Sequence, residues 1–259
     1  MINVNTENHI MLIEVDRVKK LNALTIEMYS QMAKAYYELD TNDDLWVGLI
    51  YAKGPHFTSG IDLAAWSEQF AKGTGNPVAP EGEIDPYAMN NAVYCRKPLV
   101  MATQGYCFTW GFELLLNTEI RVAATDTRFC AMEVRRGFFP TGGGTLRLPK
   151  EIGWGNANRY ILTGEEMTAE EAYRLGLVQF LTEPGKQFDK AFEIARRIAS
   201  VAPLGVQGAL KHSRITYLQG EDAVKDVLWK DTSAIMKSED MKEGLQSFLE
   251  RRPAVFKGK

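Results

Sequence analysis

The fold is decided by residues 99–124, which read LVMATQGYCFTWGFELLLNTEIRVAA. Residues 99–103 and 120–124 are short, largely apolar runs, as expected of strands that are buried on both faces. Residues 112–116 lie between these two runs and predict a short buried helix. A strand, a helix and a second strand in this order favour a parallel crossover, and therefore an α/β core.

The segments on either side extend the same pattern. Residues 10–16 and 46–52 are rich in branched or apolar residues and predict two more strands. Residues 24–39 carry apolar residues at helical spacing, and Thr25 is a suitable N-cap. Further helices are predicted to open at Thr168 and to span 187–201, 204–219 and 222–238. We therefore divide the chain into an α/β core, residues 1–200, and a C-terminal helical region, residues 201–259.

The composition excludes several classes of protein. Of the 259 residues, 45% are hydrophobic and 24% charged, which is typical of a soluble globular protein. Thirty Lys and Arg against 33 Asp and Glu give a net charge of −3. This balance argues against general nucleic-acid binding, which needs a surplus of basic residues on one face. No apolar run approaches the roughly eighteen residues of a membrane span, and residues 1–8 lack the layout of a signal peptide.

The cysteines and histidines favour neither a disulfide framework nor a metal site. The three cysteines are far apart and form no CxxC pair, so we expect a reducing, cytoplasmic environment. The three histidines are scattered, and none pairs with a cysteine or aspartate at metal-ligand spacing. We expect no bound metal.

Two stretches are rich in glycine. Residues 73–86 hold three glycines and three prolines, and they predict an exposed, mobile loop. Residues 141–145 read TGGGT and lack the Lys-Ser/Thr pair that completes a phosphate-binding loop.

Three segments carry the residues that could do chemistry. They are residues 57–63 (FTSGIDL), 104–113 (QGYCFTWGFE) and 129–144 (FCAMEVRRGFFPTGGG). Each has glycine at a turn beside a helix start, where backbone N–H groups are free to face a developing negative charge. Two of the segments bring a carboxylate, Glu113 and Glu133, into apolar surroundings. Glycines at such turns also serve tight geometry alone, so the spacing by itself indicates only an α/β enzyme with an unassigned site.

The order and spacing of these segments resemble the crotonase, or enoyl-CoA hydratase/isomerase, family across essentially the whole chain. Residues 17–24 (RVKKLNAL) are similar to the family's R-P-K-x-L-N-A-L, and residues 57–63 to its F-x-x-G-x-D-[IL] turn. Residues 105–114 resemble its G-x-x-x-G-G-G-x-E-L turn, and residues 119–124 (EIRVAA) the D-I-R-x-A that follows. Further matches are PTGGGTLRL at 140–148, LTG at 162–164, AYRLGLV at 172–178 and FLERR at 248–252.

The resemblance implies a coiled ββα superhelical core with a C-terminal helical region that assembles trimers, or dimers of trimers. It also implies an acyl-CoA thioester as the substrate, with coenzyme A part of that substrate and no permanently bound cofactor. By position, the backbone amides of Ile61 and Trp110 would hold the thioester oxygen as it becomes an enolate. Losing one such donor typically costs about 10²–10³ in rate.

The resemblance further implies the roles of the two glutamates. Glu113 would activate a water for attack at Cβ, and Glu133 would deliver a proton to Cα. Burial among apolar groups would raise a glutamate's pKa and keep one of the two protonated near neutral pH. We therefore expect a 2-enoyl-CoA hydratase. A double-bond isomerase, a hydrolase or C–C lyase of the family, and a non-catalytic crotonase-like binding protein are the alternatives.

The resemblance also implies contacts to coenzyme A. Lys19 could approach its phosphates, and Ser59, Asp62 and Leu63 lie on the turn that would run beside it. Phe248 and Arg251 correspond to positions that touch the nucleotide bound by a neighbouring subunit. For Arg251, a solvated terminal charge is the alternative.

The chain departs from the family pattern at two points. The usual triple glycine is Thr109-Trp110-Gly111, so Trp110 places a large indole where the family carries none. We expect this indole to point toward the substrate and to favour short or planar acyl groups. If it points into the core instead, chain-length preference should be ordinary. The turn that often reads A-D-I-K is IDLA at residues 61–64, which lacks the lysine.

Overall fold

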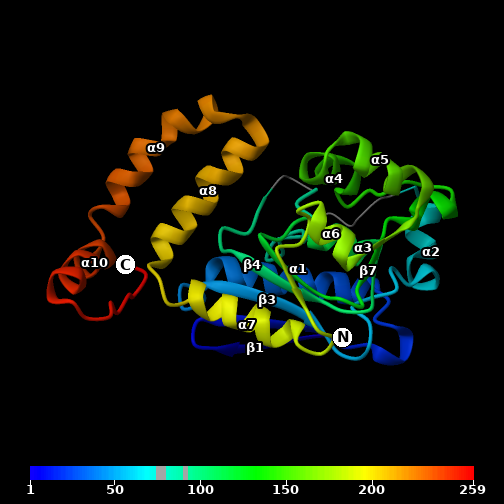
Figure 1. Cartoon of the computed structure of the whole chain (residues 1–259), viewed down its shortest axis with the longest axis horizontal. Helices are drawn as coiled ribbons and strands as arrows, with labels where there is room; N and C mark the ends of the chain where they lie inside the picture. Colours follow the sequence, from blue (N-terminus) through cyan, green and yellow to red (C-terminus); the bar gives the residue numbers. More distant parts are fainter. Residues whose placement is uncertain (74–79, 90–92) are drawn as a thin grey trace.

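A six-stranded sheet lies at the centre of the structure, a computed structural model that describes residues 1–73, 80–89 and 93–259 (Figure 1). Its strand order is β1-β2-β3-β4-β6-β9. Only the β1–β2 pair is antiparallel; every other neighbouring pair is parallel. The strands are β1 (Ile2–Glu7), β2 (Ile10–Val15), β3 (Val47–Ala52), β4 (Leu99–Thr103), β6 (Ile120–Ala124) and β9 (Phe180–Thr182). The four strands expected from the sequence, β2, β3, β4 and β6, are confirmed, and so is the α/β class.

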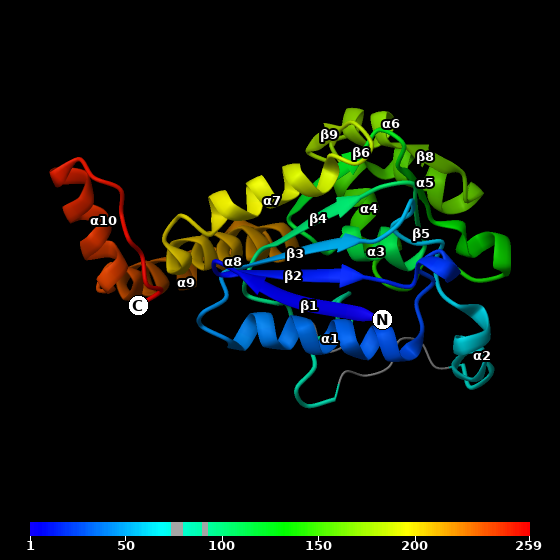
Figure 2. The same ribbon diagram turned by 90° about the horizontal axis from the view of Figure 1, so that it is seen from below.

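The central strands are apolar on both faces because a helix covers each face (Figure 2). α1 (Ile26–Thr41) packs on one side, where Met32, Tyr36 and Leu39 join the larger core cluster. α7 (Gln187–Ile198) packs on the other side through Ala191 and Ile194. Burial on both faces explains why these strands lack the alternation of a half-exposed sheet.

A second layer carries the short elements that surround the site. It is a three-stranded sheet of β5 (Tyr106–Phe108), β7 (Arg128–Cys130) and β8 (Glu166–Thr168), in the order β5-β7-β8. The helices that follow these strands are α3 (Trp110–Leu115), η2 (Met132–Arg136), α4 (Gly144–Ile152), α5 (Trp154–Thr163) and α6 (Ala169–Arg174). A further helix, α2 (Leu63–Ala71), precedes the first gap in the described residues.

Two helices begin where the sequence predicts. The Thr25 hydroxyl accepts a hydrogen bond from the Met28 amide at 3.2 Å and caps α1. The Thr168 hydroxyl accepts one from the Glu171 amide, also at 3.2 Å, and caps α6. Both contacts satisfy an amide that has no partner inside the helix.

The C-terminal part is helical, as expected. α8 (Pro203–Gln219) and α9 (Glu221–Ile235) pack against each other, and α10 (Glu239–Glu250) follows them. α10 lies at the far end of the molecule from α2 (Figure 1). Within the described residues, no helix is both long enough and apolar enough to span a membrane. The expected boundary at residues 200/201 falls between α7 and α8 and stays a prediction.

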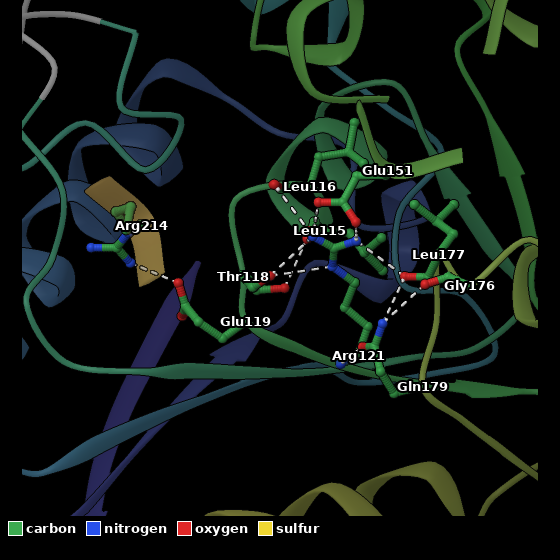
Figure 3. A network of polar contacts seen from close by, with 10 residues as sticks. All are labelled: Leu115, Leu116, Thr118, Glu119, Arg121, Glu151, Gly176, Leu177, Gln179 and Arg214. Carbon is green, nitrogen blue, oxygen red and sulfur yellow. Dashed lines mark hydrogen bonds and ion pairs between the residues drawn. The ribbon is translucent and has the colours of Figure 1, made fainter. Parts of the chain in front are cut away.

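A polar network joins α8 to the central sheet (Figure 3). Arg214 on α8 donates to Glu119 Oε1 at 2.6 Å and to the Cys95 carbonyl at 2.9 Å. Beside it, the buried Arg121 forms an ion pair with Glu151 at 3.2 Å.

The expected exposed loop at residues 73–86 is wrong for its last residues. Residues 74–79 lie outside the described part of the chain, but residues 84–86 are buried. Asp85 holds them in place by accepting hydrogen bonds from the Tyr29 hydroxyl at 2.8 Å and from the amides of Tyr87 and Met89 at 2.9 and 2.8 Å. One buried carboxylate thus satisfies the hydrogen-bond donors of this turn. The proline and glycine content of the stretch does not indicate such a contact.

Candidate active site

A cavity of about 190 Å³ lies between α2, α3 and η2. Five aromatic side chains line it: Trp66, Phe70, Tyr87, Trp110 and Phe138. Its other apolar lining residues are Leu24, Ile61, Leu63 and Met132. Its polar lining residues are Ser59, Thr109, Glu113, Glu133, Arg136 and Thr141. Of the residues expected at the site, Ser59, Ile61, Leu63, Trp110, Glu113 and Glu133 therefore meet in one place.

The first turn brings the Ile61 amide to this cavity. Gly60 has φ +116°, and a Cβ built there would lie 2.5 Å from Thr109 Oγ1, so only glycine fits. The Ile61 amide makes no hydrogen bond to any described residue. Asp62 does not line the cavity: its carboxylate pairs with Arg17 at 2.9 Å and accepts from the Ala65 amide at the start of α2. Asp62 therefore holds the turn and caps α2.

The second turn brings the Trp110 amide to the same cavity. Thr109 adopts φ 47° and ψ −111°, a conformation that is strained for a β-branched residue. Its amide donates to the Cys130 carbonyl at 2.8 Å, and its own carbonyl accepts from the Glu113 amide at 2.9 Å. The Trp110 amide, like that of Ile61, makes no hydrogen bond within the described residues. The two turns thus offer two unpaired donors.

The Trp110 side chain departs from the expected direction. The residue is only 3% exposed, and its indole Nε1 donates to the buried Thr58 hydroxyl at 2.8 Å. Its ring also packs against Phe57, with ring centroids 6.0 Å apart. The indole is therefore held against the core and forms part of the cavity wall instead of standing free in the cavity.

Glu113 is held by the glycine-rich segment at residues 141–145. It lies on α3, is 5% exposed, and its Oε1 accepts a hydrogen bond from the Gly144 amide at 2.9 Å. A Cβ built at Gly142 would lie 2.8 Å from Oε2 of the same carboxylate. Burial raises the pKa of Glu113 to about 8, and the charge of Glu133 raises it as well. The backbone N–H groups of Gly142 and Gly144 act in the opposite direction on this pKa.

Glu133 approaches from η2 on another side of the cavity. It is 3% exposed, and its Oε2 has no hydrogen-bond partner among the described residues. Burial raises the pKa of Glu133 to about 7. Because two nearby carboxylates repel each other, they titrate as a pair that retains a proton near neutral pH. Such a pair can offer a base and an acid to one substrate.

Besides Asp62, three expected residues do not line the cavity in this chain. Lys19 is exposed in the short 3-10 helix η1 (Val18–Lys20). Phe248 and Arg251 lie on and directly after α10, at the opposite end of the molecule (Figure 1). The roles expected for Phe248 and Arg251 involve a neighbouring subunit, so they stay predictions.

Sequence reasoning did not single out several residues of the wall. Trp66 and Phe70 belong to α2, which was not predicted, and Tyr87 follows the stretch taken for an exposed loop. Thr58 is buried behind the wall and does not line the cavity, and the sequence marks it only as part of its turn. A signal for Tyr87 exists in the sequence, because Ile84 near the end of residues 73–86 and Tyr87 directly after them are large apolar residues.

The comparison with known families fits this geometry. The family described as enoyl-CoA hydratase/isomerase matches residues 5–259, which is nearly the whole chain. The chain belongs to the enoyl-CoA hydratase/isomerase family. Enzymes of this family, the crotonases, act on coenzyme A thioesters, so the cavity lies in a crotonase-family enzyme.

Relatives and solved structures agree with this membership. The chain is 30% identical to "Enoyl-CoA hydratase EchA19" of Mycobacterium tuberculosis, over 99% of this chain and 96% of that protein. It is 32% identical to a carnitinyl-CoA dehydratase of Salmonella paratyphi A, over 100% and 98%. A crystal structure of a probable enoyl-CoA hydratase/isomerase from Mycobacterium abscessus superimposes with a TM-score of 0.94 at 36% identity, covering 100% of this chain and 98% of that chain. The crotonase fold expected from the sequence is confirmed.

Proposed function

We propose that this crotonase-family enzyme is an enoyl-CoA hydratase that adds water syn across the 2,3 double bond of a 2-enoyl-CoA thioester. The observation that carries the proposal is the pair of buried glutamates, Glu113 and Glu133, in one cavity with the unpaired amides of Ile61 and Trp110. Relatives named enoyl-CoA hydratase and carnitinyl-CoA dehydratase support water addition or its reverse.

The proposed reaction uses each of these four groups once. The Ile61 and Trp110 amides donate to the thioester oxygen, which gains negative charge as the enolate forms. Glu113, as carboxylate, takes a proton from water while the water oxygen attacks Cβ. Glu133, as carboxylic acid, gives its proton to Cα. The pair ends with one proton, as it began, and the product is a 3-hydroxyacyl thioester.

The lining of the cavity supports a short or planar acyl group. The cavity measures about 190 Å³, and its aromatic lining includes Trp66, Phe70, Tyr87 and Phe138. Flat rings stack favourably with conjugated or aromatic groups, and a small cavity with this lining suits a short acyl group.

A double-bond isomerase is the second candidate, because of the two glutamates Glu133 is the one with a buried oxygen, Oε2, that has no hydrogen-bond partner among the described residues. An isomerase needs one carboxylate to move a proton between two carbons. The test is a spectrophotometric assay of the conjugated thioester with crotonyl-CoA, cinnamoyl-CoA and a long-chain 2-enoyl-CoA. Loss of the conjugated absorbance supports hydration. Activity only on 3-enoyl-CoA, with gain of conjugation, would establish the isomerase instead.

For assembly, we propose a homotrimer or dimer of trimers formed through α8, α9 and α10. Trp229, Phe248 and Leu249 on these helices are 75%, 80% and 73% exposed, which is unusual for large apolar side chains in a stable surface. In such an assembly, Phe248 and Arg251 would reach the coenzyme A of a neighbour. Lys19, Ser59 and Leu63 would contact it from the same subunit. We place the enzyme in the cytoplasm.

A further inference from the structure

The Thr58 hydroxyl occupies a point between the two turns of the site. It accepts hydrogen bonds from the Trp110 indole Nε1 at 2.8 Å and from the Gly60 amide at 3.0 Å. It donates to the Asn22 carbonyl at 2.8 Å. Thr58 is fully buried, and two acceptances with one donation fill the capacity of a hydroxyl group.

This hydroxyl links two segments that are distant in the sequence. The Gly60 amide directly precedes the Ile61 peptide, and the Trp110 indole belongs to the residue whose own amide is the second donor. Two hydrogen bonds to the Thr58 hydroxyl therefore connect Trp110, one donor residue, with Gly60, the residue before Ile61. Besides these, two backbone bonds also join the two segments: the Phe108 amide donates to the Thr58 carbonyl at 3.2 Å, and the Thr58 amide donates to the Tyr106 carbonyl at 2.7 Å.

The second turn needs such a restraint because Thr109 is strained. A glycine reaches a positive φ without cost, whereas a threonine at φ 47° and ψ −111° relaxes unless its surroundings hold it. Relaxation at Thr109 would rotate the next peptide, which carries the Trp110 amide. The indole bond to Thr58 fixes the residue immediately after the strained one.

We propose that Trp110 is a positioning residue whose indole, through the Thr58 hydroxyl, sets the spacing of the two amide donors. The inference rests on the proposed use of these amides as an oxyanion hole. Donors of this kind act only within about 2.7–3.1 Å of the developing charge. A small error in their spacing therefore lowers the rate of the chemical step more than it lowers substrate binding.

The first experiment compares four variants by steady-state kinetics. Trp110→Phe keeps a ring but removes the N–H, and Thr58→Val keeps the shape of the side chain but removes the hydroxyl. Each should lower kcat about tenfold and change KM by less than about twofold. Thr58→Ser restores the hydroxyl and should recover most of the rate. Trp46→Phe is the matched control, because Trp46 is buried and its Nε1 donates to the Asp43 carbonyl away from the cavity.

A double variant tests whether the two side chains act as one unit. If the indole acts through the hydroxyl, Trp110→Phe combined with Thr58→Val should lower kcat no more than the more damaging single variant does. Multiplying effects would overturn the proposal, as would a Trp110→Phe enzyme that matches Trp46→Phe in kcat.

The second experiment needs no turnover. Butyryl-CoA is saturated and cannot be hydrated, so the infrared stretch of its bound thioester carbonyl reports the donors alone. The wild type should shift this band to lower frequency, and Trp110→Phe and Thr58→Val should reduce the shift while Thr58→Ser and Trp46→Phe keep it. An unchanged shift in Trp110→Phe would overturn the proposal. A wild type that shifts the carbonyl but hydrates no enoyl-CoA would instead refute the proposed function alone.

Discussion

The two glutamates of the site are both buried, but they differ in their hydrogen bonds. Glu113 is fastened by the Gly144 amide, whereas Glu133 has an oxygen without a partner among the described residues. A carboxylate that accepts N–H bonds is suited to remain a base, and an unpartnered carboxyl oxygen is free to reach a substrate carbon. This difference supports the order of roles proposed for the pair against the order of the pKa values, in which Glu113, at about 8, holds a proton more tightly than Glu133, at about 7.

Replacing either glutamate by glutamine tests these roles. Glu113→Gln and Glu133→Gln should each lower kcat at least about 10²-fold, because glutamine keeps the shape but cannot exchange a proton. Glu14→Gln, a buried glutamate on β2 that does not line the cavity, is the matched control and should keep the rate. Circular dichroism checks that all three remain folded. Full activity in both cavity variants would refute the assignment, and loss in Glu133→Gln alone would favour the isomerase.

The raised pKa of Glu133 also makes stability depend on pH. Burial raises this pKa from 4.5 to about 7, so the folded state binds the proton more tightly than the unfolded state. The contribution of this proton to the free energy of unfolding is fully present below about pH 4.5 and is lost as the pH rises through about 7. Glu133→Gln removes this loss and should stabilise the protein at pH 8 by on the order of 3 kcal/mol relative to its effect at pH 4.5. Urea unfolding at the two pH values measures the difference, and equal effects at both would contradict it.

Most of the secondary-structure elements that the sequence predicts carry a clear local pattern. β2, β3, β4 and β6 are largely apolar runs, and α1, α7, α8 and α9 are long enough for their helical spacing to show. The short helices α3 and α6 are indicated by a buried apolar run and by an N-cap threonine. The elements that were missed are mostly three-residue strands or helices with glycine or proline inside them, such as α4 with Pro149. Their conformation depends on tertiary contacts that a local pattern does not contain.

The same limit applies to the site. Glu113 and Glu133 stand out in the sequence because a carboxylate among apolar residues is unusual. Thr58 does not stand out, because its importance comes from partners on two other segments, Trp110 and Asn22. The direction of the Trp110 indole was mispredicted for the same reason.

The junction between α8 and the sheet can be tested directly. Arg214 bridges α8 to Glu119 and Cys95, and the Glu119 carboxylate also accepts from the Leu99 amide of β4 at 2.8 Å. The Arg214 and Glu119 side chains are only 19% and 23% exposed. Arg214→Gln leaves a largely buried carboxylate without its cation and should destabilise the protein by about 1–3 kcal/mol.

Thermal unfolding and hydrogen exchange check this prediction. Amides of α8 should exchange faster in Arg214→Gln than in the wild type. Arg159→Gln is the control, because Arg159 and its partner Glu165 are 60% and 48% exposed, and surface pairs contribute about 0–1 kcal/mol. Equal stability of the two variants would show that the junction does not depend on this ion pair.

At the scale of the whole molecule, α2, which helps to line the cavity, and α10 lie at opposite ends (Figure 1). Trp229 on α9 and Phe248 and Leu249 on α10 are large apolar side chains that are exposed. A second hollow, of about 620 Å³, lies between α8, α9 and Arg96, and the apolar residues that line it include Ile215, Leu218 and Ile235. Exposed apolar surfaces of this extent are ordinarily covered by another protein surface.

Sedimentation should therefore show a trimer or a dimer of trimers at micromolar concentration. Within that assembly, Arg251→Ala should raise KM by no more than about fivefold if its contact with a neighbour's coenzyme A is exposed to solvent. Phe248→Ala should also raise KM without changing kcat. A monomer at micromolar concentration would refute the assembly, and an unchanged KM for both variants would leave these residues as surface groups.

The position of the Glu113 carboxylate limits which residues can stand at positions 142 and 144. A Cβ at Gly142 would lie 2.8 Å from one carboxylate oxygen, and a Cβ at Gly144 would lie 3.1 Å from the other. Neither glycine has a positive φ, so the carboxylate itself, together with its neighbours Tyr87 and Pro140, excludes side chains there. A side chain at Gly142 would therefore push the Glu113 carboxylate out of its position. Without that carboxylate the contact is gone, so Gly142→Ala should cost less stability in a Glu113→Ala background than in the wild type.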